Sequence, residues 1–218
     1  MRATEDSYRH KGLRRRLVET VRGKGITNER ILTAIENIPR HFFLDSAFDE
    51  VAYEDKAFPI EAGQTISQPY TVAYQTQLLE VKPLEKVLEI GTGSAYQACV
   101  LAEIGAKVFT IERQKKLFDS NKQFPFLKKY LNIKFFYGDG YEGLPTYAPF
   151  DKVLITAAAP IVPVKLITQL KPGGMMVIPF GGGDVQVMKR LIKQADGSIV
   201  EEVFDQFSFV PMLQGKND

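Results

Sequence analysis

The stretch Val87-Leu-Glu-Ile-Gly-Thr-Gly-Ser94 decides the fold class of this 218-residue chain. It starts as a short apolar run with one acid, continues into glycines at positions 91 and 93, and precedes a helical pattern from Tyr96. Glycine allows a sharp backbone turn and the close approach of a ligand. A strand, a glycine-rich turn and a helix in this order are typical of nucleotide-binding α/β proteins.

Short apolar segments alternate with helical patterns after residue 84. Continuous apolar strands are typical of a parallel sheet that helices cover on both faces. Asp196-Gly197 separates two further strand patterns and suits a tight hairpin turn. We therefore predict a doubly wound, Rossmann-like α/β fold whose sheet ends in antiparallel strands. The predicted strands are 86–90, 107–111, 133–137, 152–156, 175–179, 185–194 and 198–204, and the predicted crossover helices lie within 96–103 and 113–130.

The first 83 residues carry helical patterns instead. Apolar residues recur at helical spacing at positions 31, 34, 35 and 38, after the capping candidates Thr27 and Asn28 and before Pro39. No internal repeat, low-complexity tract or long linker separates the two parts. We expect a single domain over residues 1–218, in which a helical N-terminal extension (1–83) packs on an α/β core (84–218).

The formal net charge of +2 is too small for the broad basic surface of a committed nucleic-acid binder. The run Arg14-Arg15-Arg16 is a local exception. Apolar residues at positions 13, 17, 18 and 21 form one face of a predicted helix, which leaves the three arginines on its solvent side. A patch for nucleic acid or for an acidic partner is the alternative. We expect no nucleic-acid partner.

The composition indicates a reducing compartment and no membrane contact. No apolar stretch approaches the about 20 residues that span a bilayer, and the N-terminus lacks the apolar core of a secretory signal. Cys99 is the single cysteine, so no intramolecular disulfide can form, and its place in a predicted helix favours a buried residue over a nucleophile. Cys99 and the two histidines have no zinc-binding spacing. We expect a cytoplasmic protein without a metal.

Two acids follow predicted strands at places that suit an adenosine ligand. Glu112 lies 21 residues after Gly91, close to the spacing at which an acid accepts hydrogen bonds from ribose hydroxyls. Asp139 lies between Gly138 and Gly140, where its carboxylate could accept from an amino group such as that of adenine. The alternatives are a solvated acid at a strand end for Glu112 and a simple turn for Asp139.

The adenosine pattern alone does not choose between NAD and S-adenosylmethionine. Glu89 within the first motif argues against a pyrophosphate, because a carboxylate repels two phosphates. A cofactor with a positively charged sulfonium suits this position better. No Gly-Lys-Ser/Thr phosphate loop is present. We therefore favour S-adenosylmethionine.

Further motifs surround the glycine-rich turn in a fixed order. The most specific is Gly63-Gln-Thr-Ile-Ser-Gln-Pro-Tyr70, and the others are PRHF at 39–42, AYED at 52–55, FPI at 58–60, GDG at 138–140, ITAA at 155–158, QLKPGG at 169–174 and FVPML at 209–213. From about Arg30 to Gly215 the chain resembles the protein-L-isoaspartate (D-aspartate) O-methyltransferases. Ala95 departs from the family pattern, which usually has glycine there, and the strand Lys134-Phe-Phe-Tyr137 is more apolar than usual.

The resemblance implies a Rossmann-like S-adenosylmethionine-dependent methyltransferase fold and a repair reaction. Family members methylate the free α-carboxylate of L-isoaspartyl residues in damaged proteins and peptides, and D-aspartyl residues are a further expected acceptor. The ester collapses to a succinimide, whose hydrolysis returns some normal aspartyl linkage. A carboxylate is already ionised at neutral pH, so catalysis must come from alignment and water exclusion. We expect a monomer whose partners are damaged proteins.

The resemblance also implies the site residues. Ser67 is the expected catalytic residue, since its hydroxyl could hold one oxygen of the acceptor carboxylate, and a helix N-cap before Pro69 is the alternative. His41 is expected to be packed and hydrogen-bonded and stays outside the catalytic set. The expected cofactor-binding residues are Gln64, Thr65, Ile66, Glu89, Gly91, Thr92, Gly93, Ser94, Glu112, Asp139 and Gly140.

Two other functions stay open. One is a methyltransferase of the same fold that acts on nucleic acid or a small molecule, since fold does not decide the substrate. Against it, Thr156-Ala-Ala-Ala-Pro160 stands after the fourth strand in place of the Asn-Pro-Pro-Tyr or Asp-Pro-Pro-Tyr of amino-methylating nucleic-acid enzymes. The other is a non-catalytic module that keeps the adenosine pocket, which cofactor binding without methyl transfer would favour.

Overall fold

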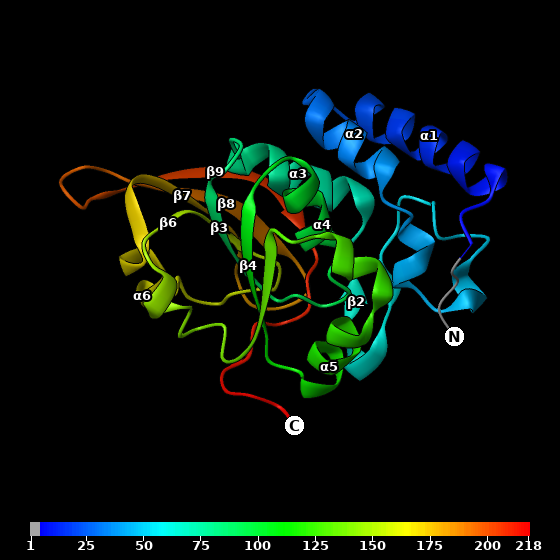
Figure 1. The fold of residues 1–218 in the computed structure, drawn as a ribbon. Helices are drawn as coiled ribbons and strands as arrows, with labels where there is room; N and C mark the ends of the chain where they lie inside the picture. Colours follow the sequence, from blue (N-terminus) through cyan, green and yellow to red (C-terminus); the bar gives the residue numbers. More distant parts are fainter. Residues whose placement is uncertain (1–4) are drawn as a thin grey trace.

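A seven-stranded sheet forms the centre of the computed structural model, which describes residues 5–218 (Figure 1). The strand order is β5-β4-β3-β6-β7-β8-β9. The strands are β3 (Lys86–Ile90), β4 (Lys107–Glu112), β5 (Ile133–Tyr137), β6 (Phe150–Ile155), β7 (Leu170–Phe180), β8 (Gln186–Lys193) and β9 (Ile199–Phe207). The first five pair in parallel, whereas β7–β8 and β8–β9 are antiparallel. The predicted doubly wound fold with antiparallel C-terminal strands is confirmed.

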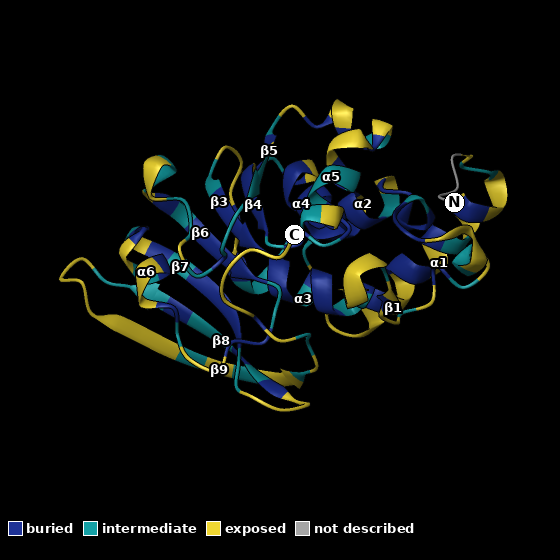
Figure 2. Ribbon diagram, turned by 90° about the horizontal axis from the view of Figure 1, so that it is seen from below, coloured by how far each residue is buried: buried dark blue, intermediate teal, exposed yellow. Residues whose placement is uncertain are grey.

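Helices cover both faces of this sheet. They are α1 (Tyr8–Gly23), α2 (Glu29–Asn37), α3 (Pro69–Leu79), α4 (Tyr96–Glu103), α5 (Lys115–Gln123) and α6 (Val164–Thr168), with short 3-10 turns at Arg40–Phe43, Ser46–Phe48, Glu61–Gly63, Pro125–Lys129 and Pro145–Tyr147. One apolar core joins α1 to α4 with one face of the sheet, and a second core places α6 on the other face (Figures 1 and 2). In the described part of the chain, no helix is both long and apolar enough to cross a membrane.

The direction in which the chain adds strands to the sheet reverses between β3 and β6. From β3 the chain moves outward through β4 and β5 to one edge, then returns to add β6 and β7 on the other side of β3. Loops that leave the two sides of such a switch point diverge and open a crevice at the carboxyl ends of the strands. The edge strand β9 is mostly exposed (Figure 2). The sequence therefore builds its binding crevice near the middle of the sheet.

The structure differs from the prediction at several places. The segment predicted as one helix over 113–130 contains α5 followed by a 3-10 turn, because Pro125 lacks an amide N–H and restricts the residue before it. Strand β7 begins at Leu170, before the predicted start at 175. The N-terminal part also contains a short antiparallel pair, β1 (Phe58–Pro59) and β2 (Thr65–Ile66).

The prediction that all three arginines of the run 14–16 face solvent is wrong for Arg14. Arg14 is only 5% exposed, whereas Arg15 and Arg16 are exposed as predicted. The Arg14 guanidinium donates two hydrogen bonds to Asp6, at 2.7 and 2.9 Å, and one to the carbonyl oxygen of Glu36, at 2.7 Å. A planar cation with five donors can be buried when carboxylate and carbonyl partners surround it.

Candidate active site

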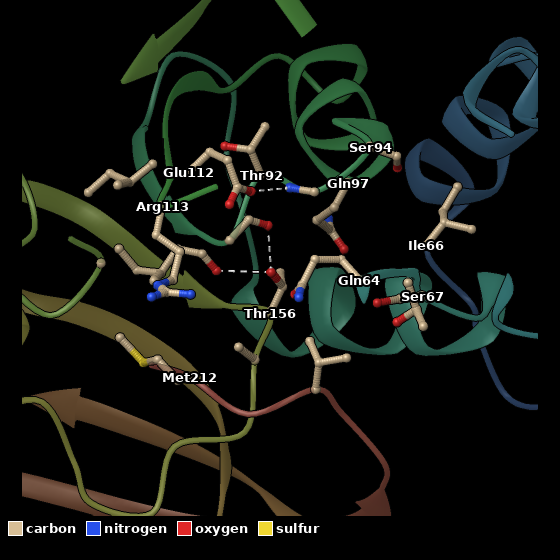
Figure 3. A pocket seen from close by; sticks show the side chains of 18 of the residues that line it. Gln64, Ile66, Ser67, Thr92, Ser94, Gln97, Glu112, Arg113, Thr156 and Met212 are labelled. Carbon is tan, nitrogen blue, oxygen red and sulfur yellow. Dashed lines mark hydrogen bonds between the residues drawn. The ribbon is translucent and has the colours of Figure 1, made fainter. Parts of the chain in front are cut away.

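A cavity of about 790 Å³, partly open to solvent, lies at the carboxyl ends of β3, β4 and β6 (Figure 3). The glycine-rich turn after β3 forms one wall, and the segment 64–67 before α3 forms the opposite one. Figure 3 shows Thr92 and Glu112 on the first side and Gln64 and Ser67 on the second. The cavity thus occupies the switch point of the sheet.

Ten of the twelve predicted site residues line this cavity. They are Gln64, Thr65, Ile66, Ser67, Gly91, Thr92, Gly93, Ser94, Glu112 and Gly140, whereas Glu89 and Asp139 do not line it. Lining residues that were not predicted include Gln97, Arg113, Thr156 and the segment 210–213. That last segment reaches the cavity because it pairs with Ala158, whose N–H donates to Val210 and whose carbonyl accepts from Met212, both at 2.8 Å. The sequence contains this segment as the motif FVPML, but only the fold brings it to the cavity.

Position 91 accepts only glycine for a steric reason. Gly91 adopts φ +95°, and a Cβ there would lie 2.7 Å from Oγ1 of Thr156. The Thr156 hydroxyl lies 2.9 Å from the carbonyl oxygen of Ile90 and 2.8 Å from that of Gly91, so it cannot move away freely. The turn is therefore held against the end of β6.

Ala95 ends this turn in a left-handed conformation. Its φ is +70° and its ψ is +10°, and its N–H donates to the carbonyl oxygen of Thr92 at 2.8 Å. A non-glycine residue costs roughly 1 kcal/mol in this region because its Cβ crowds the following carbonyl oxygen. Alanine at the usual glycine position keeps the turn at this small cost.

Glu112 is the acid that faces the cavity. It is 4% exposed, and its Oε2 and Oε1 accept backbone N–H hydrogen bonds from Gly93, at 2.8 Å, and Gln114, at 2.7 Å. Burial raises the pKa of Glu112, and these backbone donors oppose the shift. A carboxylate has about four acceptor positions, so each oxygen retains capacity for a ligand hydroxyl. Glu112 both orders the glycine-rich turn and offers the predicted acceptors.

Ser67 lies between β2 and α3 on the opposite wall. The alternative role of Ser67 as a helix N-cap is wrong, because Gln68 occupies the N-cap position of α3. The Gln68 side chain makes no capping hydrogen bond. The carboxylate of Asp55 instead accepts from the N–H of Tyr70, at 2.8 Å. The Ser67 hydroxyl is thus not used to start α3.

Sequence comparison identifies the group to which this fold and cavity belong. Residues 13–217 match the model of the family described as protein-L-isoaspartate(D-aspartate) O-methyltransferase. The chain belongs to this family. The expected family membership is confirmed over nearly the whole chain.

Curated relatives carry the same family name. A protein-L-isoaspartate O-methyltransferase of Christiangramia forsetii is 54% identical over 217 residues, which cover 98% of this chain and 100% of the relative. One of Cytophaga hutchinsonii is 56% identical over 209 residues, which cover 96% of this chain and 94% of the relative.

Solved structures agree on the fold. One titled protein-L-isoaspartate O-methyltransferase superposes with a TM-score of 0.81 at 27% identity, covering 91% of this chain and 65% of its own. A Plasmodium falciparum structure, titled as a putative family member in complex with S-adenosyl-L-homocysteine, gives a TM-score of 0.77 at 24% identity and covers 96% and 99% of the two chains.

In this family member, Asp139 takes part in a turn beside the cavity. Its Oδ1 accepts from the N–H of Tyr141, at 2.9 Å, as expected for an aspartate that closes a turn two residues on. Its Oδ2 accepts from the N–H of Gly215, at 2.7 Å. Neighbouring Gly140 lines the cavity, and a Cβ there would overlap the Ile90 side chain. Asp139 therefore holds the C-terminal segment against the cavity edge.

Glu89 is fully buried within β3. It shares a sheet face with Val87, which packs in the α1–α4 core, and neither of its carboxyl oxygens lies at hydrogen-bond distance from a partner. Burial raises the pKa of Glu89 to about 8, an effect that the Thr110 side chain opposes and the Glu112 carboxylate increases. The carboxyl group does not line the cavity, so the argument that it repels a pyrophosphate there has no geometric basis.

We expect Glu89→Gln to raise the free energy of unfolding by about 1 to 3 kcal/mol near pH 8 and by much less near pH 5. The folded state favours the protonated acid, whose pKa lies above its ordinary value of 4.5. The native chain therefore loses stability relative to the variant as the pH rises from about 4.5 to 8. Urea unfolding at several pH values measures this difference, and a difference independent of pH would contradict the assignment.

His41 is packed and hydrogen-bonded, as expected. It is buried, its Nε2 donates to the carbonyl oxygen of Glu5, at 3.0 Å, and its Nδ1 lies 2.5 Å from the Tyr53 hydroxyl. Burial lowers the pKa of His41, and the Glu5 carbonyl opposes the shift. His41 does not line the cavity.

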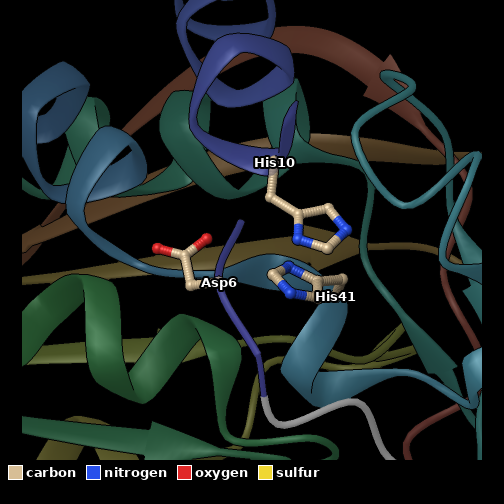
Figure 4. Close-up of side chains that lie close together, drawn as sticks. All are labelled: Asp6, His10 and His41. Atoms are coloured by element: carbon tan, nitrogen blue, oxygen red, sulfur yellow. The ribbon is translucent and has the colours of Figure 1, made fainter. Parts of the chain in front are cut away.

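Asp6, His10 and His41 form a cluster that the sequence did not suggest (Figure 4). One potential ligand atom of each lies within 4.8 Å of the others, but all three side chains have hydrogen-bond partners. The two imidazole rings stack with centroids 3.8 Å apart, and the Asp6 carboxylate forms an ion pair with Arg14. Stacked rings direct their nitrogens sideways, so this geometry fits a packed hydrogen-bond cluster better than a metal site.

Proposed function

We propose that this chain transfers the methyl group of S-adenosylmethionine to the free α-carboxylate of L-isoaspartyl residues in damaged proteins and peptides, with D-aspartyl residues as a further acceptor. The reaction starts the conversion of these residues to normal aspartyl through a succinimide. The observation that carries the proposal is that the segment 64–67 and the glycine-rich turn line one cavity from opposite sides. Both motifs that support the family assignment therefore reach a common space.

The cavity suits an adenosine-containing cofactor. Glu112 supplies acceptors of the kind that bind ribose hydroxyls, and Ile90, Ile111 and Met212 supply apolar walls. Bound S-adenosylmethionine supplies an activated methyl group on a positively charged sulfonium.

The chain contributes alignment and exclusion of water to the transfer. Among the residues that line the cavity, Glu112 is the only acid and Arg113 is the only base, and Arg113 donates to the carbonyl oxygens of Gly215 and Gln214. The acceptor carboxylate needs no general base because it is ionised at neutral pH. We assign the Ser67 hydroxyl to hold one carboxylate oxygen, so that the other oxygen faces the methyl group.

We further propose that the chain acts as one domain and as a monomer in the cytoplasm, without a nucleic-acid partner. The core shared by α1 to α4 and the sheet supports the single domain, because the N-terminal helices bury their apolar faces there.

Methyl transfer from labelled S-adenosylmethionine to a synthetic isoaspartyl peptide tests the function, with the normal aspartyl peptide as the matched control. We expect a base-labile methyl ester on the isoaspartyl peptide alone. Label on neither peptide, with cofactor binding intact, would contradict the proposal. That result would favour another acceptor or a non-catalytic binding module.

A further inference from the structure

Arg40 is a fully buried cation close to the cavity. It is 0% exposed, and its Nη1 has no hydrogen-bond partner. Its Nε donates to the carbonyl oxygen of Ala52, at 3.1 Å, and its Nη2 donates to those of Lys56, at 3.1 Å, and Ser67, at 2.9 Å. One guanidinium thus joins the 52–56 turn to the peptide of Ser67.

The same guanidinium also contacts the cofactor side of the cavity. Its central carbon lies 5.0 Å from the ring centroid of Tyr96, the first residue of α4, which directly follows the glycine-rich turn and lines the cavity. The donors of a guanidinium lie in one plane at fixed angles. Arg40 therefore sets the distance and orientation between the Ser67 peptide and the start of α4.

Burial of this cation is costly. It lowers the pKa of Arg40 to about 10, and Tyr96 and Asp55 oppose the shift, so the side chain is still charged at neutral pH. A well-packed apolar side chain often stabilises a core at least as well as a buried charge. The particular contribution of the guanidinium is its simultaneous bonds to three carbonyl oxygens.

Asp55 holds the same loop from its other side. Its carboxylate accepts from the N–H of Tyr70, at 2.8 Å, and from the side-chain amide of Gln68, at 3.0 Å. The 52–56 turn is thus bonded to the residues after Ser67 directly and to Ser67 itself through Arg40. The backbone around Ser67 is anchored on both sides.

We propose that Arg40 is a positioning residue for methyl transfer, which holds the Ser67 carbonyl and thereby orients the Ser67 hydroxyl towards the cofactor side of the cavity. Arg40 does not line the cavity, so it acts through Ser67. The inference rests on the proposed function and on the role proposed there for Ser67.

Arg40→Lys tests this role, because lysine keeps the charge but cannot reproduce the planar fork. We expect kcat with an isoaspartyl peptide to fall about tenfold, while affinity for S-adenosyl-L-homocysteine stays within about twofold. Arg40→Gln gives the same comparison without a buried charge. Arg190→Lys is the matched control, since Arg190 is partly buried and donates to the carbonyl oxygen of Leu78 and to Glu202, none of which lines the cavity or belongs to the 52–56 turn. It should lower Tm and leave kcat within about twofold.

A double-mutant cycle with Ser67→Ala separates positioning from a general loss of stability. If Arg40 acts through Ser67, Arg40→Lys causes no further loss of kcat in the Ser67→Ala background. The same fold loss in both backgrounds would overturn the proposal, and so would an unchanged kcat in the Arg40 variants, assayed below their Tm. Failure of the proposed function is distinct, because the unaltered chain would then not methylate the isoaspartyl peptide.

Discussion

Ser67→Ala is expected to lower kcat for an isoaspartyl peptide about 30- to 100-fold, with cofactor affinity nearly unchanged. A hydrogen bond to a charged group contributes about 1.5 to 3 kcal/mol, and a misaligned acceptor carboxylate loses further rate. The hydroxyl is available for this role because it does not cap α3. Cofactor affinity is preserved because the substitution leaves the glycine-rich turn, Glu112 and the residues 64–66 unchanged.

Initial rates with labelled cofactor and titration calorimetry with S-adenosyl-L-homocysteine measure the two effects separately. Ser67→Thr is the matched control, since it keeps a hydroxyl at the same position and should recover much of the turnover. Equal turnover of Ser67→Ala and the unaltered chain would remove Ser67 from the mechanism.

Glu112→Ala is expected to weaken cofactor binding about 30-fold or more, which corresponds to at least about 2 kcal/mol. The substitution removes the acceptors proposed for the ribose hydroxyls. It also leaves the N–H groups of Gly93 and Gln114 without their acceptor, so the glycine-rich turn loses order. Both the loss of acceptors and the loss of order in the turn weaken cofactor binding.

Calorimetry with S-adenosyl-L-homocysteine measures this loss. Glu112→Gln should give a smaller effect, because the amide keeps one acceptor oxygen and the shape of the side chain. Glu103→Gln is the control for removing an acid outside the cavity. The Glu103 carboxylate accepts from the Tyr130 hydroxyl and does not line the cavity. Unchanged affinity in Glu112→Ala would show that the ribose assignment is wrong.

The predictable part of the site consists of short local patterns. The glycine-rich turn, the spacing to Glu112 and the segment 64–67 each lie within one stretch of chain, and the structure brings all of them to one cavity. Thr156, Gln97 and the segment 210–213 were missed. Thr156 and the segment 210–213 reach the cavity through the pairing of β6 with β3 and of the C-terminal segment with Ala158, and such long-range pairing leaves no periodic signal. Gln97 reaches it from the first turn of α4, directly after the glycine-rich turn.

The amino-acid sequence by itself determined the α/β class, the parallel strands, the antiparallel end of the sheet and the family. The fold features follow from apolar periodicity and from glycines at turns, which act within a few residues of each other. The family follows from the resemblance of motifs such as Gly63-Gln-Thr-Ile-Ser-Gln-Pro-Tyr70. Only the tertiary structure decided the surroundings of the charged side chains. Arg14 is buried against the Asp6 carboxylate and the Glu36 carbonyl oxygen, Arg40 is buried among carbonyl oxygens, and Glu89 is buried without a hydrogen-bond partner. The burial of a charge depends on which distant groups surround it, and that information exists only once the chain is folded.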